Sequence, residues 1–361
     1  MPSRPALTLD DLRRHAIART FFTPTVLPKA IARLGFVQAD PIRAPARAQD
    51  LTLRHRVAGY AAGDLERRYP RLAVEEDFFV NYGFLPRATH HLMHPRTPHG
   101  PWTKARWAQA HAVLDFVQER GVVHPREVDA QFAHGKTTNW FGGASNASTQ
   151  LLDDMHYRGL LRVARRDAGV RLYAAREAAP PPGDPQAAHD ALVDVVVAQY
   201  APLPAATLGL LLSHLCVGVP QWRGERAAAL ARARGRLAQA RVDGVDWYWP
   251  CGERLRRDDA EPRVRLLAPF DPLVWDRRRF EHFWGWAYRF EAYTPAPKRR
   301  LGYYALPLLW RDQVIGWANI AANGGTLAPQ FGYVAGHAPR EAAYRRELEA
   351  ELQRLREFLR L

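Results

Sequence analysis

Residues 146–175 read NASTQLLDDMHYRGLLRVARRDAGVRLYAA, and this stretch decides the fold expected of the chain. Its first part, 146–158, predicts a helix, because an Asn or a Ser can cap its start and Gly159 can end it. Two β-rich runs, LLRVARR and VRLYA, follow around a tight turn at Asp167-Ala168-Gly169. A helix followed directly by a hairpin is typical of the second half of a winged helix.

Two more helices are predicted in front of this stretch. Residues 107–120 carry apolar side chains at helical spacing, and 125–132 begin with a proline at its favoured first position. Three helices and a hairpin predict a winged helix, whose third helix usually enters the major groove. We therefore expect Asn146 and Ser148, at the start of that helix, to contact DNA. The alternative is a small helical domain with an incidental hairpin.

The helical pattern recurs on both sides of this unit. Helices are predicted at 187–199, 204–215 and 225–241, and VDGVDWYWP then predicts a strand, a turn and a strand. The first hundred residues also begin with two helices, 8–19 and 24–34. The helix at 225–241 carries a basic face, made of Arg226, Arg232, Arg234 and Arg236. Helical units repeated in this way can line up as one extended basic surface.

From residue 263 the chain changes to strands. Aromatic and β-branched runs predict a small antiparallel sheet or barrel; they are RVRLLAPF, YRFEAYT, GYYALPLLW and QVIGWANIA. The fold class expected is α+β, with tandem winged-helix domains plus a small C-terminal antiparallel β-barrel domain. Pro-rich stretches at 94–101 and 179–185 separate units. The expected domains are 1–100, 101–178, 187–255, 262–336 and a C-terminal helix at 337–361.

The charge of the chain points to a polyanionic partner. Its 361 residues carry a net charge of +14, and 47 of the 51 basic residues are arginine. Arginine presents a planar fork of donors that fits phosphate oxygens, so the surplus favours nucleic acid. A codon bias towards GC-rich triplets can explain arginine in place of lysine, but it does not explain why acidic residues fail to balance the charge.

Other classes of protein are excluded by simple features. No run of eighteen apolar residues occurs and no signal peptide begins the sequence, so no membrane partner is expected. The only two cysteines, Cys216 and Cys251, lie far apart, which argues against a disulfide framework and a cysteine-ligated zinc site. We expect a cytoplasmic, nucleoid-associated protein. No dimerisation segment is obvious, so we expect a monomer.

Generic catalytic motifs are absent from the sequence, which has no phosphate loop, no GxSxG and no HExxH. His90, His91 and His94 cluster in RATHHLMHPR, but no carboxylate accompanies them at ligand spacing and Pro95 follows at once. We therefore expect no metal there, and solvated or DNA-facing histidines are the favoured interpretation.

The segment LGFVQADPIR, residues 34–43, is an apolar run interrupted by two polar side chains. If it is extended, alternation puts Gln38 and Asp40 on one face. A carboxylate beside an amide can hold and polarise a water molecule, as hydrolysis of an N-glycosidic bond requires. The alternative is a turn at Asp40-Pro41 with Gln38 capping a neighbouring backbone group, and the residues alone favour that alternative.

Several long blocks carry a resemblance to a known family. They are LGFVQADPI, WFGGASNASTQLLDDMHYRGLLRVARR, and RLLAPFDPLVWDRRR followed by YRFEAYTPAPKRRLGYYALPLL. On these blocks the chain resembles the bacterial AlkZ/YcaQ-like winged-helix DNA glycosylases, from about residue 8 to residue 335. Members of that family remove alkylated bases, and some unhook interstrand crosslinks. The family combines tandem winged helices and a β-barrel around a basic concave surface.

The resemblance implies roles for particular residues. The family's catalytic element is a Gln–hydrophobic–Gln or Gln–hydrophobic–Asp motif, and Gln38-Ala39-Asp40 matches the Asp form. Asp40 would then be the general base or the electrostatic partner of an oxocarbenium ion, and Gln38 would orient the attacking water. No metal or cofactor is implied. The family's strand near Gly316 usually carries an Arg and further charged residues, where this chain has Trp317 and Asn319.

The sequence therefore predicts a monofunctional DNA glycosylase that acts on cationic N7-alkylated purines in duplex DNA and on interstrand crosslinks. The alternative is a non-catalytic winged-helix DNA-binding protein, such as a transcription regulator. The candidate phosphate contacts are Arg43, Arg47, Lys298, Arg299 and Arg300. For each of these five, a solvated surface charge is the competing interpretation.

Overall fold

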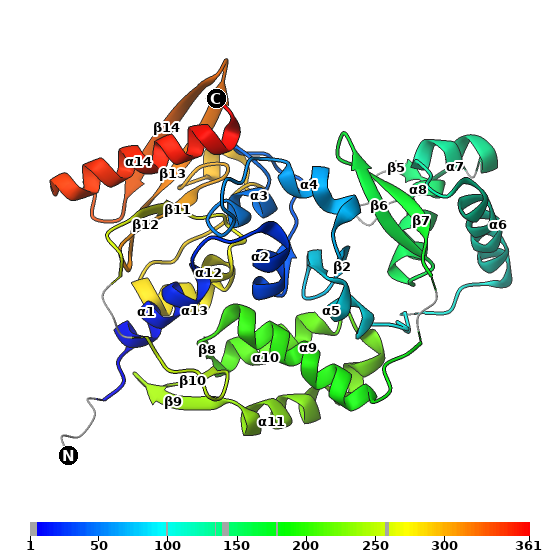
Figure 1. Cartoon of the computed structure of the whole chain (residues 1–361), viewed down its shortest axis with the longest axis horizontal. Helices are drawn as coiled ribbons and strands as arrows, with labels where there is room; N and C mark the ends of the chain where they lie inside the picture. The colour runs from blue at the N-terminus through cyan, green and yellow to red at the C-terminus, as the bar shows by residue number, and fades with distance from the viewer. Residues whose placement is uncertain (1–5, 99, 134, 139–143, 178–179, 257–259) are drawn as a thin grey trace. The chain divides into compact units, whose positions relative to one another are not determined.

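The computed structural model describes residues 6–98, 100–133, 135–138, 144–177, 180–256 and 260–361. The chain forms two compact units (Figure 1). Unit 1 comprises Met1–Leu65, Asp194–Leu211 and Leu230–Leu361, and unit 2 comprises Glu66–Val193 and Leu212–Ala229. The five-part division expected from the sequence stays a prediction. Among the described helices, none combines the length and the apolar character needed to cross a membrane.

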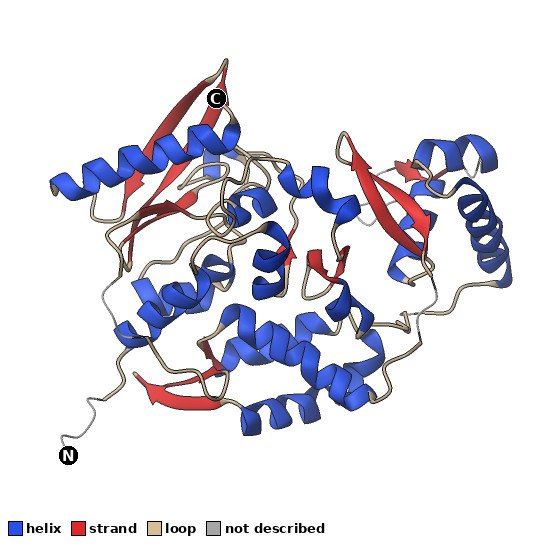
Figure 2. Ribbon diagram, in the orientation of Figure 1, coloured by secondary structure: helices blue, strands red, loops and turns tan. Residues whose placement is uncertain are grey.

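Unit 2 contains the predicted order of three helices and a hairpin. These elements are α6 (Lys104–Arg120), α7 (Pro125–Phe132), α8 (Ala147–Tyr157), β6 (Leu161–Asp167) and β7 (Val170–Ala175). Figure 2 shows β6 and β7 as a two-stranded ribbon beside these helices. A short ribbon of β4 (Lys136–Thr138) and β5 (Ala144–Asn146) lies between α7 and α8 in the chain and was not predicted. The assignment of the unit as a winged helix stays a prediction.

Local sequence signals account for the ends of these helices. The carboxamide of Asn146 accepts a hydrogen bond from the Ser148 backbone N–H and caps α8. Gly159 follows α8 with φ +78°, a conformation that glycine adopts at little cost. The hydrophobic core of these elements contains fully buried apolar side chains, among them Val113, Val117, Val128, Leu151 and Met155. Residues 140–143 of the WFGGAS block lie outside the described residues.

Unit 2 also holds a second hairpin, which begins after α4 (Asp64–Arg68) and η1 (Tyr69–Arg71). Strands β2 (Val74–Phe78) and β3 (Tyr82–Pro86) pair antiparallel and are followed by the short helix α5 (Arg87–His91).

The middle of the chain forms α9 (Pro185–Tyr200), β8 (Leu203–Pro204), α10 (Ala205–Leu215), η2 (Pro220–Glu225) and α11 (Arg226–Arg236). The prediction of one helix over 225–241 is wrong at its end, because α11 stops at Arg236 and β9 (Ala238–Val242) begins two residues later. β9 pairs with β10 (Val245–Trp249) in a hairpin that turns at Asp243-Gly244, and this hairpin takes the place of the last helical turn.

Unit 1 begins with α1 (Leu9–Thr20), α2 (Leu27–Leu34), β1 (Val37–Gln38) and α3 (Ala48–Leu53). Its C-terminal part is a four-stranded antiparallel sheet in the order β11 (Val264–Leu266), β12 (Leu306–Trp310), β13 (Gln313–Asn323) and β14 (Thr326–Tyr333). Helix α14 (Ala342–Leu359) packs along this sheet (Figure 1). Its buried Glu351 accepts a hydrogen bond from Leu266 N at 3.0 Å.

Two predictions for this region are wrong, one about a closed barrel and one about a strand. The sheet does not close into a barrel within the described residues, since β11 and β14 form its two edges. YRFEAYT, residues 288–294, forms no strand; the chain there leaves α12 (Pro272–Trp275) and α13 (Arg277–Trp284), and leads to the 3₁₀ helix η3 (Ala296–Lys298). Its residues are held by side-chain bonds instead, such as the Tyr288 hydroxyl to Ala305 O at 2.7 Å.

Candidate active site

The segment that carries Gln38 and Asp40 is fixed at its start by Gly35. This glycine ends α2 with φ +74°, and a Cβ atom there would lie 2.7 Å from Val195 Cγ1. The next residue is anchored to α9, because Gln199 Nε2 donates to Phe36 O at 2.7 Å. The chain then extends as β1, so the motif follows directly after the turn at Gly35.

Gln38 and Asp40 are both buried, and the prediction that they share one face stays a prediction. Gln38 and Asp40 are each only 8% exposed, whereas Ala39 between them is half-buried. The backbone N–H of Asp40 donates to Oε1 of the buried Gln49 on α3 at 3.2 Å. Asp40 Oδ1 accepts from Ile42 N at 2.8 Å, so the predicted alternative of a turn at this position is also present.

The turn uses only one oxygen of the carboxylate. Asp40 Oδ2 has no hydrogen-bond partner among the described residues. Within the same part of the chain, Oε1 of Gln38 is buried without a partner, so Gln38 does not cap a backbone group. Buried polar atoms are nearly always hydrogen-bonded, so the unpartnered Gln38 Oε1, with Asp40 Oδ2 two residues away, indicates a place for a donor that the described residues do not supply.

The electrostatics of Asp40 suit a base. Burial raises the pKa of Asp40, and the hydrogen bond from Ile42 opposes this rise only in part. Its charge reaches two tyrosines that the sequence did not single out. Burial, and next the charge of Asp40, raise the pKa of Tyr293 and of Tyr304. Tyr304 is 2% exposed, and its hydroxyl has no partner among the described residues.

A carboxylate of raised pKa beside an unpartnered amide can hold one water and take a proton from it. Residues 31–358 match the family model of DNA glycosylases that are AlkZ-like. The chain belongs to the AlkZ-like family of DNA glycosylases. The resemblance inferred from the sequence is thereby confirmed, and DNA is the substrate of this family of hydrolases.

A solved structure shows the same fold. The chain is similar to the Streptomyces sahachiroi DNA glycosylase AlkZ, with a TM-score of 0.62 and 14% sequence identity. The likeness covers 98% of this chain and 97% of that one. It therefore extends over both units of the glycosylase.

The predicted DNA contacts differ in their surroundings. Arg43, Lys298 and Arg300 are exposed, and Arg299 is half-buried with Nε donating to Thr294 O at 2.7 Å. Arg47 is only 8% exposed; burial raises the pKa of the nearby Asp50, and the charge of Arg47 opposes this rise in part.

The two predicted contacts at the start of α8 have structural partners. Ser148 is fully buried and its hydroxyl donates to Asp129 Oδ1 at 3.2 Å, while Asn146 caps the helix. All seven DNA contacts stay predictions; Arg43, Lys298 and Arg300 are exposed, whereas Arg47 and Ser148 are buried.

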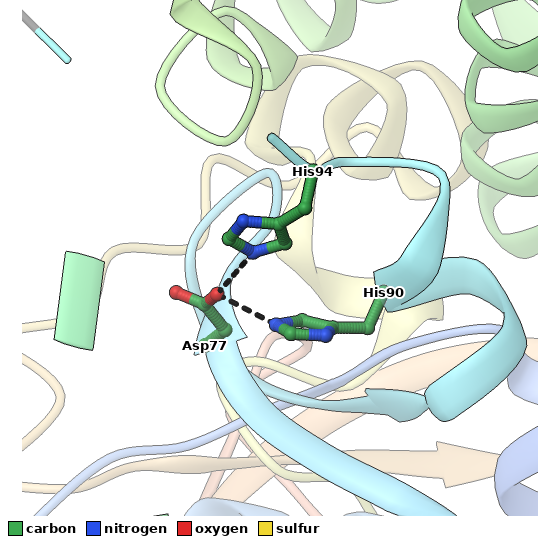
Figure 3. Close-up of side chains that lie close together, drawn as sticks. All are labelled: Asp77, His90 and His94. Carbon is green, nitrogen blue, oxygen red and sulfur yellow. Dashed lines mark hydrogen bonds and ion pairs between the residues drawn. The ribbon is translucent and has the colours of Figure 1, made fainter. Parts of the chain in front are cut away.

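The expectation of solvated or DNA-facing histidines is wrong for two of the three. His90 and His94 are 6% and 7% exposed, and both point at the carboxylate of Asp77 on β2 (Figure 3). Their Nε2 atoms lie 2.9 and 3.4 Å from Asp77 Oδ2. The carboxylate was missed because Asp77 lies on the neighbouring hairpin, outside any ligand spacing along the sequence.

These three side chains have the spacing of a metal site but not its electrostatics. The buried guanidinium of Arg96 binds both oxygens of Asp77, at 3.1 and 3.2 Å. Burial alone would raise the pKa of Asp77, but Arg96 and the two histidines hold it well below its usual value. Burial lowers the pKa of His94 to about 3, which keeps this ring neutral. The cluster fits an internal ion pair, because a divalent cation would meet the positive charge of Arg96.

Proposed function

We propose that this DNA glycosylase hydrolyses the N-glycosidic bond of cationic N7-alkylated purines in duplex DNA, and that it also unhooks interstrand crosslinks of this chemistry. The observation that carries the proposal is the pairing of a buried, unpartnered acceptor, Gln38 Oε1, with Asp40 Oδ2, a carboxylate oxygen two residues away that accepts no hydrogen bond from the described residues. The enzyme is monofunctional in this proposal, since water is the nucleophile and no cofactor takes part.

Gln38 and Asp40 have separate roles in the proposed reaction. A water molecule donates one hydrogen bond to each of the two acceptors, which directs its lone pair at C1′ of the lesion. The bond between C1′ and N9 of the purine breaks, and its electrons neutralise the cationic base. The bond from the water oxygen to C1′ forms, and the water proton passes to Asp40. Because the base leaves as a neutral molecule, no strong general acid is needed.

The experiment is single-turnover base release from a duplex that carries one N7-methylguanine. Asp40→Asn keeps the acceptor for Ile42 N but cannot take the proton, and we expect a loss of rate of about 10²- to 10⁴-fold. Asp246→Asn is the matched control, because Asp246 is a partly exposed carboxylate of β10 paired with Arg241. The control variant is expected to release base like the wild type.

Binding of the same duplex separates chemistry from recognition. Equal affinity of wild type and Asp40→Asn, with release lost in the variant, supports the proposal. Equal release by both proteins would remove Asp40 from the mechanism. Release by neither protein, from this duplex or from an N7-crosslinked one, would overturn the proposed substrate and favour a DNA-binding protein without the activity.

A further inference from the structure

Unit 1 contains a cavity of about 590 Å³ in the region where a strand was wrongly predicted. Its lining includes Trp286, Phe290, Glu291, Lys298, Arg300 and Leu301, and we name it the Trp286 cavity. A volume of this size lies within the range of pockets that bind small organic ligands. None of the residues proposed above as catalytic lines it.

Two residues of β13, Trp317 and Asn319, contact residues that line the Trp286 cavity. Trp317 on β13 stacks on Trp286, with ring centroids 5.7 Å apart and an interplanar angle of 23°. Asn319 on the same strand donates from Nδ2 to Leu301 O at 2.7 Å. Trp317 and Asn319 therefore support two residues of the cavity lining, Trp286 and Leu301, from behind.

The charges around the cavity favour an anionic ligand. Lys298 and Arg300 are exposed, and neither side chain has an acidic partner among the described residues. The carboxylate of Glu291 is turned towards the backbone, where Oε2 accepts from Arg300 N at 2.9 Å and from Leu301 N at 2.7 Å. With Arg289, which also lines the cavity, three cations stand against one carboxylate.

We propose that the Trp286 cavity binds one unstacked nucleotide of the DNA, with its base against Trp286 and Phe290 and its phosphate on Lys298 and Arg300. Aromatic faces accept any base by stacking, and paired cations accept a phosphate. The inference rests on the chain acting on DNA and does not depend on the roles proposed for Gln38 and Asp40.

Phe290, which lines the cavity, contacts two further aromatic residues. The ring of Phe290 contacts Tyr304 and Tyr293, with centroids 5.3 and 6.0 Å apart, and these are the two tyrosines whose pKa the charge of Asp40 helps to raise. Phe290 therefore connects the lining of the Trp286 cavity with Tyr293 and Tyr304.

The experiment is equilibrium binding of the full chain to two undamaged, fluorescently labelled duplexes, one fully paired and one with a single unpaired deoxyadenosine. The wild type is expected to bind the second duplex more tightly. Trp286→Ala is expected to reduce that preference about tenfold, the scale of one lost base–aromatic stack. No base release is measured, so failure of the proposed catalytic pair leaves this result unaffected.

Two further variants guard against misfolding of Trp286→Ala. Lys298→Ala combined with Arg300→Ala removes exposed cations only, and it too is expected to abolish the preference for the unpaired nucleotide. Arg346→Ala combined with Arg345→Ala is the matched control, because both are exposed arginines on α14, away from the cavity lining. The control is expected to weaken binding to both duplexes alike and to keep the preference.

Competition with deoxyadenosine monophosphate identifies the source of the nucleotide. No competition at millimolar concentration, together with a preference lost in the cavity variants, supports binding of DNA. Competition that Arg300→Ala abolishes, with an unchanged duplex preference, would assign the cavity to a free nucleotide and overturn its assignment to DNA. A wild type without any preference, or a preference that survives in all cavity variants, would overturn the proposal.

Discussion

Asp40 in unit 1 and Asp77 in unit 2 are both buried carboxylates, but their surroundings are opposite. Asp77 accepts hydrogen bonds from Arg96, His90 and His94, so both of its oxygens are used. Asp40 accepts one hydrogen bond from a backbone N–H and keeps one oxygen without a described partner. The pKa of Asp77 lies well below its ordinary value, and that of Asp40 lies above it.

The difference shows how burial alone fails to identify a functional acid. A buried carboxylate with a buried cation is stabilised as an anion and has no capacity left for substrate. A buried carboxylate with few donors is destabilised as an anion and gains from taking a proton. On this comparison Asp77 supports the structure, and Asp40 is the candidate for chemistry.

Replacement of Asp77 should have the largest effect on stability. Asp77→Asn leaves the buried charge of Arg96 without its counter-charge, and we expect the free energy of unfolding to fall by about 3–5 kcal/mol. Urea denaturation measures this loss. A loss below about 1 kcal/mol would show that Arg96 does not depend on Asp77 and would break the comparison.

Gly35→Ala should have the next largest effect, and it tests the backbone that carries Asp40. The substitution forces an alanine into φ +74° and places its Cβ 2.7 Å from Val195 Cγ1. We expect a loss of about 1–3 kcal/mol in the free energy of unfolding and a loss of base release by the folded fraction. Gly59→Ala has a similar positive φ but open space around its Cβ, so a stability loss without loss of release is expected for that control.

Asp40→Asn should change stability in the opposite sense to Asp77→Asn, by a smaller amount. A carboxyl whose pKa rises on folding destabilises the native state once it ionises, and this penalty is absent below its ordinary pKa. The variant is therefore expected to equal or exceed the wild type in thermal stability at pH 7, and to lose that advantage near pH 3. A variant much less stable than the wild type at pH 7 would mean that Asp40 is a structural anion like Asp77.

Removal of metal should have no effect. Because Arg96 already neutralises Asp77, dialysis against EDTA is expected to leave both base release and the melting temperature unchanged. Added zinc should not stabilise the protein. A zinc-dependent rise in melting temperature that His90→Gln abolishes would show that the Asp77 cluster binds an ion after all.

The sequence predicted features that depend on neighbours in the chain. The bounds of α7 and the cap of α8 by Asn146 follow from local rules, and the structure has both of them. The Gln38–Asp40 motif could be singled out for the same reason, since its two side chains are only two residues apart.

Features that depend on distant pairing were missed. Asp77 meets His90 and His94 only because the β2–β3 hairpin folds back, and Tyr304 comes within reach of the charge of Asp40 from far along the chain. Residues 288–294 have the composition of a strand but pair with no strand, and side-chain hydrogen bonds such as that of Tyr288 hold the loop instead. Periodicity reports burial and cannot report which partner provides it.

The pH dependence of single-turnover base release tests the central claim most directly. If the unpartnered carboxylate of Asp40 is the base, the rate rises with pH through a limb whose pKa lies above the ordinary value of about 3.9. Asp40→Asn should lower the rate and remove that limb, after subtraction of the non-enzymatic rate. A limb at or below the ordinary value, or one that persists unchanged in Asp40→Asn, would contradict the account.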